Sequence, residues 1–274
     1  MNEILRVESL TKRFTKKGFF RSQLQTLTAV DDVSFSLNFE EILAIAGQSG
    51  SGKSTIAKLI LRAIEPDSGK IFFNEKEVLS YSSLKKFRLQ CQMIYQDPYD
   101  SINPRMRISD IINEPLEIHN IGNKKSRNEI VLNALQQVRL EPASDIGKKY
   151  PHMLSGGQRQ RVVIARALVV KPKLIIADEP VSMLDVSIRA EILELMNEIR
   201  NKNNISFIYI THDLETAKYF ADKIIILNAG KIVEFGNINN VLTKPVHQYT
   251  KSLIEAISEP DHENLYKEKN VDNV

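Results

Sequence analysis

The sequence predicts an α/β fold with a parallel core sheet, an antiparallel β lobe and an inserted helical subdomain. Three observations support this prediction. Short apolar runs alternate with segments whose apolar residues recur at helical spacing, as in a doubly wound parallel sheet. One of these runs leads through a glycine-rich loop into a helical pattern. Between about residues 98 and 168 the buried-strand signal is missing and only helical patterns remain, which predicts an insertion into the sheet domain.

The elements of the first third follow from their apolar spacing. Residues 4–7 are mostly apolar, and in 30–37 apolar side chains alternate with polar ones, which predicts half-buried antiparallel strands. Residues 41–46 are almost all apolar and precede a glycine, as expected of a parallel strand covered on both faces. Residues 54–64 carry apolar side chains at helical spacing, and 66–69 predict a turn.

The later elements continue the alternation of strands and helices. The pattern predicts helices at 108–118 and 128–140, further buried strands at 173–177 and 205–210 with a helix between them, a β-hairpin at 224–235 and a last helix at 246–257. We therefore expect one large domain over 1–257, with the subdomain at about 98–168 inserted, and a polar tail over 258–274.

Composition excludes several classes of protein. The 274 residues are 42% hydrophobic and 26% charged, which excludes a disulfide-stapled mini-protein and disorder over most of the chain. The net charge of +3 does not call for a nucleic-acid partner. Cys91 is the only cysteine, so we expect it to be a small buried side chain in a reducing compartment. We see no signal peptide and no apolar run long enough to span a bilayer, and expect neither export nor membrane insertion.

A glycine-rich motif is the strongest chemical signal. Its sequence matches G-x-x-x-x-G-K-[ST] between a predicted strand and a predicted helix. Backbone N–H groups of such a loop converge on phosphate oxygens, the lysine reaches the β- and γ-phosphates, and the serine hydroxyl is a ligand for Mg²⁺. We expect this loop to bind ATP and Mg²⁺ through Gly47, Gln48, Ser49, Gly50, Ser51, Gly52, Lys53, Ser54 and Thr55.

Two acidic residues follow the predicted strand at 173–177. Ligands of open α/β sheets bind at the carboxyl ends of parallel strands, where Asp178 and Glu179 are expected to lie. Asp178 suits the Mg²⁺ shell, and Glu179 suits the polarisation of a water that attacks the γ-phosphate.

A second helix start carries anion-binding chemistry. We expect Ser155 to be the N-cap of a helix. Gly156 and Gly157, which precede Gln158, have no side chains to cover the backbone N–H groups that could bind an anion. Because this start lies more than a hundred residues after the first loop, two readings stay open. The chain binds two ligands, or two chains face one ligand from opposite sides.

These motifs together resemble a known family. The run Leu-Ser-Gly-Gly-Gln at 154–158, the phosphate loop, Gln96, Asp178-Glu179 and His212 resemble, in order and spacing, the ATP-binding subunit of an ATP-binding-cassette (ABC) transporter. This resemblance implies the P-loop NTPase fold of an ABC cassette. It also implies a head-to-tail dimer of cassettes with two ATP molecules between them.

The resemblance also implies roles for single residues. Each ATP lies on Lys53 and Ser54 of one subunit and is capped by Ser155 and Gly157 of the other, with Asp185 across the interface. Glu179 is the general base, and His212 contacts the γ-phosphate. Gln96 senses the attacking water and Mg²⁺, whose ligands are Ser54, Gln96 and Asp178. An aromatic side chain stacks on adenine; Phe14 is our choice, and Phe19 and Phe20 compete with it.

A narrower resemblance concerns residues 96–105, 114–116 and 245–253. These segments are similar to the ATPases of oligopeptide, dipeptide and nickel importers, except that Gln248 stands where proline is usual. Some relatives carry a cysteine cluster in the tail; this chain has none, and we expect no metal centre there. The resemblance implies ATP hydrolysis that drives import of oligopeptides or dipeptides.

The same resemblance implies partners and a location. We expect a second ABC ATPase subunit, identical or paralogous, two integral membrane permease subunits and, indirectly, a solute-binding protein, but no nucleic acid. The location implied is peripheral, on the cytoplasmic face of the inner (plasma) membrane. The alternatives are an importer ATPase for nickel or another metal complex and, less in keeping with a single cassette, a soluble ABC ATPase that acts on nucleic acid.

Overall fold

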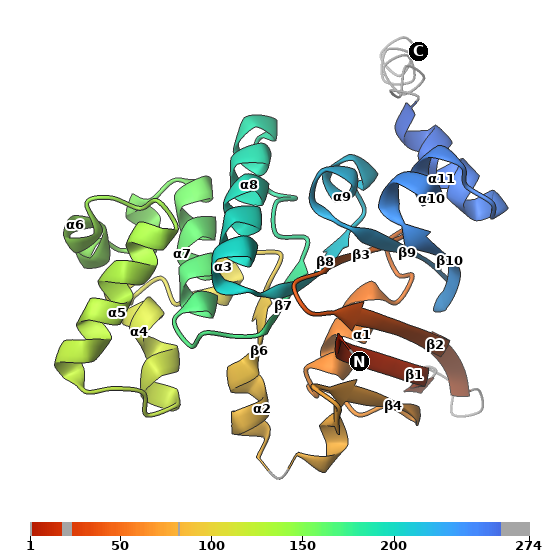
Figure 1. Cartoon of the computed structure of the whole chain (residues 1–274), viewed down its shortest axis with the longest axis horizontal. Coiled ribbons are helices and arrows are strands. Elements are labelled where there is room, and N and C mark those ends of the chain that lie inside the picture. The colour runs from red at the N-terminus through yellow and green to blue at the C-terminus, as the bar shows by residue number, and fades with distance from the viewer. Residues whose placement is uncertain (1, 18–23, 82, 259–274) are drawn as a thin grey trace, which may run out of the picture.

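The computed structural model describes residues 2–17, 24–81 and 83–258. Two sheets organise the chain: a four-stranded sheet in the order β2-β1-β4-β5 and a six-stranded sheet in the order β10-β9-β3-β8-β7-β6 (Figure 1). The strands are β1 Glu3–Lys17, β2 Leu24–Asn38, β3 Ile42–Ala46, β4 Ser68–Phe73, β5 Lys76–Glu77, β6 Cys91–Ile94, β7 Leu174–Asp178, β8 Ser206–Thr211, β9 Lys223–Asn228 and β10 Lys231–Asn237. The helices are α1 Lys53–Ile60, α2 Leu84–Gln90, α3 Pro98–Ser101, α4 Ile108–Ile118, α5 Lys124–Gln137, α6 Ala143–Lys148, α7 Gly156–Leu168, α8 Val186–Asn203, α9 Leu214–Phe220, α10 Ile238–Thr243 and α11 Gln248–Ser258.

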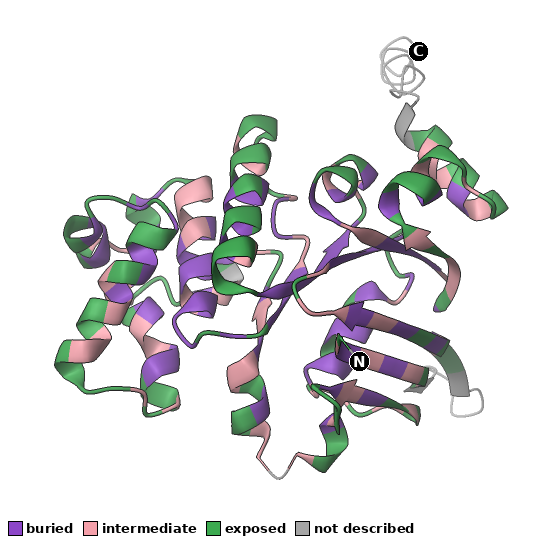
Figure 2. Ribbon diagram, viewed as in Figure 1, coloured by how far each residue is buried: buried purple, intermediate pink, exposed green. Residues whose placement is uncertain are grey.

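The six-stranded sheet contains the covered parallel core that the apolar runs predicted: β9, β3, β8, β7 and β6 run in parallel, and β10 pairs antiparallel with β9 at one edge. β3 pairs in parallel with both β8 and β9, and all five of its residues are buried (Figure 2). Side chains alternate between the faces of a strand, so Ala44 packs in one apolar cluster and its neighbour Ile45 in the other. A strand buried on both faces must be apolar throughout, which explains why this run could be read from sequence.

The two faces of the sheet are covered by different layers. One face packs against α8, α9 and the helices between β6 and β7. The other packs against α1 and the antiparallel sheet of β1, β2 and β4. Figure 1 shows the helical side and the antiparallel lobe at opposite sides of the central sheet. This arrangement leaves the carboxyl edge of the parallel strands free for loops.

The segment between β6 and β7 contains five α-helices, α3 to α7, and no strand among its described residues, as the sequence predicted. α4 has the bounds that the apolar spacing predicted. α5 begins four residues before its predicted start, because the Asn123 side chain accepts a hydrogen bond from the Ser126 N–H at 3.0 Å and caps the helix there. That these helices act as an inserted subdomain of about 98–168 stays a prediction.

The structure corrects several predicted boundaries. α1 ends at Ile60 rather than at 64, because Arg62 takes a left-handed conformation (φ 54°) that ends the helix. The predicted turn at 66–69 is wrong at its end: β4 has already begun at Ser68 and contains Gly69. β1 and β2 each extend to 15 residues and pair across several register shifts that apolar alternation did not reveal. The spacing also gave no signal for β4, β5 or α2.

The C-terminal part agrees with its prediction. β9 and β10 form the expected antiparallel hairpin, with Ala229 and Gly230 at positive φ in its turn. α11 begins at Gln248, two residues after the predicted start. The predicted polar tail lies outside the described residues apart from the end of α11. Within the described part of the chain, no helix combines the length and apolar character needed to cross a bilayer.

Candidate functional site

The carboxyl edge of the parallel sheet holds one large hollow of about 800 Å³. The loops after four parallel strands supply its polar wall: the phosphate loop follows β3, Gln96 follows β6, Asp178 and Glu179 end or follow β7, and His212 follows β8. Strands that run in parallel end at the same edge, so residues from 47 to 212 meet there. The structure therefore brings together the catalytic and metal candidates and the predicted phosphate-loop residues except Ser51, which is buried and does not line the hollow.

The phosphate loop offers an unpaired helix start to the hollow. Gly52 is the N-cap of α1 in a left-handed conformation (φ 108°), and no side chain caps the helix. The first N–H groups of an α-helix have no partner within the helix, and the helix dipole adds positive potential there. Ser54 and Thr55, in this first turn, line the hollow. This start fits a phosphate group.

Lys53 supplies the positive charge of the site. Its ammonium group is buried and donates hydrogen bonds to the carbonyls of Gly47 at 2.7 Å and Gln48 at 2.9 Å. Burial lowers the pKa of Lys53, and the nearby carboxylates of Glu179 and Asp178 oppose that shift. The Lys53 ammonium is now stabilised mainly by these two carbonyls, and a phosphate bound in the hollow would form an ion pair with it.

Asp178 and Ser54 form the candidate magnesium position. Burial raises the pKa of Asp178, and a hydrogen bond with the Ser54 hydroxyl opposes this shift. No group of three or more His, Cys, Asp or Glu side chains in the described residues could hold a metal ion. One carboxylate and one hydroxyl fit Mg²⁺, which keeps waters and takes its remaining ligands from phosphates.

Glu179 stands at the centre of the candidate catalytic group. It takes a left-handed backbone conformation (φ 46°), while its N–H donates to the carbonyl of Ile210 at 2.9 Å and so continues the ladder of the sheet. Its carboxylate accepts a hydrogen bond from Gln96 Nε2 at 3.2 Å, and the other oxygen lies 3.0 Å from His212 Nδ1. Two residues from different strands therefore hold one carboxylate in the hollow.

The aromatic candidate Phe14 reaches the same hollow from β1. It is 40% exposed and lines the wall together with Leu27 and Ala29 of β2. Phe19 and Phe20 lie outside the described residues. Stacking of Phe14 on adenine stays a prediction that this position supports.

The second predicted anion site lies elsewhere. Ser155 is the N-cap of α7, as predicted: its Oγ accepts from the Gln158 N–H at 3.3 Å, and Gln158 Oε1 accepts from the Ser155 N–H at 3.1 Å. A Cβ on Gly157 would come within 2.7 Å of Ile188 in α8, the helix that Asp185 begins as an exposed N-cap. Ser155, Gly156, Gly157, Gln158 and Asp185 do not line the hollow. The start of α7 and the start of α8 therefore lie close to one another, but neither contributes to the hollow that the phosphate loop lines.

Besides Leu27 and Ala29 of β2, two residues of α11 at the hollow were not predicted as site residues. Leu253 of α11 lines the hollow, and Tyr249 Oη of the same helix accepts a hydrogen bond from the Gln48 N–H at 3.1 Å. Their sequence signal was the segment 245–253, which resembles an importer motif. The spacing of that segment carried no information about its contact with residue 48, two hundred positions earlier.

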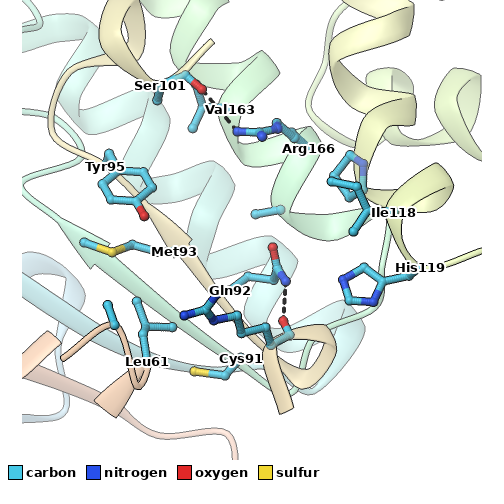
Figure 3. A pocket seen from close by; sticks show the side chains of 14 residues that line it. Leu61, Cys91, Gln92, Met93, Tyr95, Ser101, Ile118, His119, Val163 and Arg166 are labelled. Carbon is cyan, nitrogen blue, oxygen red and sulfur yellow. Dashed lines mark hydrogen bonds between the residues drawn. The ribbon is translucent and has the colours of Figure 1, made fainter. Parts of the chain in front are cut away.

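A smaller hollow of about 340 Å³ lies beside β6, α4 and α7 (Figure 3). Its wall combines apolar side chains such as Tyr95 and Ile118 with the cationic side chains of Arg88 and Arg166. Arg166 Nη1 donates to the carbonyl of Ser101 at 3.1 Å, as drawn in Figure 3. Cys91 is buried here as a free thiol, as the sequence predicted, and burial raises its pKa.

Comparison with known proteins agrees with this geometry. Residues 30–182 match the protein family described as ABC transporter. The probable peptide ABC transporter ATP-binding protein y4tS of Sinorhizobium fredii is 41% identical over 261 residues, which are 94% of this chain and 73% of that protein. The oligopeptide transport ATP-binding protein OppF of Bacillus subtilis is 43% identical over 264 residues, covering 94% of this chain and 84% of OppF. The dimeric post-hydrolysis structure of the ATP-binding cassette MJ0796 bound to ADP and Pi has a TM-score of 0.74 at 27% identity, over 85% of this chain and 98% of that one.

Proposed function

This chain belongs to the ABC transporter family, and we propose that it is the ATP-hydrolysing subunit of an importer for oligopeptides or dipeptides. The observation that carries the proposal is the convergence of Lys53, Asp178, Glu179, Gln96 and His212 on one hollow beside an uncapped helix start. Relatives named for peptide transport favour peptides over nickel or another metal complex as the solute.

The residues of the hollow divide the chemistry of hydrolysis between them. The N–H groups of the phosphate loop and the Lys53 ammonium bind the phosphates and stabilise charge on the γ-phosphate as it is transferred. Mg²⁺, when bound at Ser54, Asp178 and Gln96, supplies further neutralisation of phosphate charge. Glu179 accepts the proton of the attacking water, while Gln96 and His212 hold its carboxylate in position.

The run Leu-Ser-Gly-Gly-Gln at 154–158 supports a second role for this chain, in a site shared with another cassette. Its helix start, with exposed Ser155, lies away from the hollow and beside exposed Asp185. We propose that this face caps a nucleotide held by a second cassette, identical or paralogous. The dimeric state described for MJ0796, a structural neighbour, supports this arrangement. Of the two readings open from sequence, one ligand between two chains is therefore the one we propose.

The smaller hollow in Figure 3 is proposed as the contact with the permease subunits. It combines half-exposed Tyr95 and Ile118, at 52% and 54%, with Arg88 and with Arg166, whose Nη2 also donates to Glu114 at 2.7 Å outside the lining. Apolar side chains rimmed by cations fit the carboxyl end of a short helix, whose carbonyl groups carry partial negative charge. A cytoplasmic helix of an integral membrane subunit is such a partner, and a chain bound to it would lie at the cytoplasmic face of the membrane.

The test is purification of the tagged chain from detergent-solubilised membranes of its own host, followed by mass spectrometry and measurement of Mg-ATP hydrolysis. We expect two integral membrane proteins to copurify and hydrolysis to occur. Bound nucleic acid in place of membrane proteins would contradict the importer and support the alternative of an ABC ATPase acting on nucleic acid. Uptake of labelled peptide and of nickel by cells lacking the gene separates the two solutes.

A further inference from the structure

Helix α11 reaches the phosphate loop from the far end of the described chain. The Tyr249 hydroxyl accepts a hydrogen bond from the Gln48 N–H at 3.1 Å. Leu253, one helical turn later, lines the same hollow as Lys53. None of the binding or catalytic roles given above uses either residue, although the contact is made on the loop that holds the phosphates.

The bonded N–H belongs to the peptide unit that also anchors Lys53. The N–H of Gln48 and the carbonyl of Gly47 are parts of one planar peptide group. That carbonyl accepts a hydrogen bond from Lys53 Nζ at 2.7 Å. Tyr249 therefore holds the N–H side of this peptide group, and Lys53 bonds to its carbonyl side. Because the group is planar, fixing the direction of the Gln48 N–H also fixes the direction of the Gly47 carbonyl that positions Lys53.

The same peptide is confined by strand β9. Gly47 is buried, and a Cβ at this position would come within 2.2 Å of the carbonyl oxygen of Leu227. The backbone of the loop thus lies directly on β9 and cannot tilt further toward the strand. Rotation in the other direction is opposed by the hydrogen bond to Tyr249.

The segment that leads into α11 is itself fixed to the sheet. Glu234 of β10 accepts hydrogen bonds from the N–H groups of Val246 at 3.0 Å and His247 at 3.2 Å, and His247 Nδ1 accepts from the Tyr249 N–H at 3.1 Å. Burial alone would raise the pKa of Glu234, but the hydrogen bonds from these two N–H groups hold it below its usual value. The position of Tyr249 is therefore set by β10.

We propose that Tyr249 is a positioning residue for nucleotide binding, which fixes the Gly47–Gln48 peptide and, through its carbonyl, the ammonium of Lys53. The inference rests on the proposed function, because it assigns a role in binding ATP. Tyr249 acts through the phosphate loop and has no part in the chemical step. The C-terminal helix thereby becomes part of the nucleotide site.

The test replaces Tyr249 with phenylalanine in the full chain, which removes the hydroxyl and keeps the ring. Loss of one neutral hydrogen bond predicts a Kd for the non-hydrolysable analogue adenylyl imidodiphosphate with Mg²⁺ about 3- to 10-fold higher, measured by calorimetry. KM for ATP should rise by the same factor while kcat stays within about twofold, because only binding is affected. Amide exchange of the phosphate loop without nucleotide should become faster, since the Gln48 N–H loses its acceptor.

Tyr219→Phe is the matched control, because Tyr219 is 64% exposed on α9 and away from this contact. Glu234→Gln weakens the anchor of α11, so it should also raise the Kd for the analogue and speed amide exchange of the phosphate loop, to a smaller extent than Tyr249→Phe. This variant replaces Tyr249→Phe in the test if Tyr249→Phe does not fold. Unchanged affinity in Tyr249→Phe, or weaker affinity with unchanged exchange of the loop, would overturn the proposal. A wild-type chain that fails to bind the analogue contradicts the proposed function instead, and the exchange measurement still decides whether Tyr249 positions the loop.

Discussion

The starts of α1 and α7 carry glycine-rich sequences of similar anion-binding chemistry, but the structure treats them differently. α1 begins at Gly52 with no side-chain cap, inside a hollow that also holds Lys53 and Glu179. α7 begins at Ser155, whose side chain and that of Gln158 cap the helix reciprocally. The first start is surrounded by the groups that phosphate chemistry needs. The second has satisfied two of its own hydrogen bonds and lies outside that hollow.

This difference teaches that a helix start can have the right sequence to bind an anion and still lack the other groups that a complete binding site needs. The phosphate-loop side has a cation, carboxylates and a histidine in one place, so the proposed binding of nucleotide there needs the residues of only one chain. The start of α7 has exposed Ser155 and Asp185 in its neighbourhood, and its cation Arg159 is bonded to the Leu154 carbonyl rather than directed into the hollow. We therefore propose that the ligand of this start is a nucleotide held by a partner chain, so that hydrolysis needs the proposed dimer.

The largest effect is expected on the phosphate-loop side. Glu179→Gln removes the general base while it keeps the size of the side chain, so Mg-ATP binding should persist and hydrolysis should fall by about 10²- to 10⁴-fold. Phosphate release measures the rate, and light scattering measures the ATP-bound dimer that should accumulate. Glu215→Gln, at an exposed position on α9, is the control. Hydrolysis at the wild-type rate in Glu179→Gln would show that Glu179 is not the general base and that the phosphate-loop side is not the catalytic one.

A mixing experiment separates the two sides directly. Lys53→Ala should abolish nucleotide binding, and Ser155→Arg should leave binding intact but block the cap, so neither variant alone should hydrolyse ATP. Mixed dimers would contain one site with an intact lysine and an intact serine from opposite chains. If half of the dimers are mixed and one of their two sites works, activity should return to about a quarter of the wild-type value. No recovery on mixing, with dimers present, would contradict a site shared between chains.

A smaller effect is expected at the contact that links the two sides. Tyr99 of α3, three residues after Gln96, lies beneath the guanidinium of Arg159 in α7, with the Arg159 carbon 4.0 Å from the ring centre. An exposed cation–π contact contributes about 0.5–1 kcal/mol, so Tyr99→Leu should slow hydrolysis by about 2- to 5-fold. Nucleotide affinity should stay unchanged. Tyr219→Leu provides the control, and an equal loss in both variants would rule out a specific link.

Much of the fold could be predicted because buried parallel strands must be apolar on both faces. The runs that became β3, β7 and β8 were found for this reason. β4 and α2 were missed because their apolar positions are few and one face of each is exposed. The end of α1 was misplaced because a left-handed residue at Arg62 leaves no trace in hydrophobic spacing.

The candidate site could be predicted in its residues, because phosphate binding requires particular residue types at fixed spacings along one loop. Lys53, Glu179 and Ser155 were all named from such local patterns. Tyr249 was not, because its contact with Gln48 depends on the packing of α11 and on no local spacing. Leu253 was missed for the same reason.

The sequence by itself determined the buried strands, the chemistry of the two glycine-rich helix starts and the family, because each depends on neighbouring residues and their spacing. Only the tertiary structure decided which of these groups share one hollow. Convergence at the carboxyl edge of the sheet joins Lys53, Glu179 and His212, and it leaves Ser155 on another face. Contacts between distant segments follow from the order of strands and the packing of helices, and no single stretch of sequence encodes them.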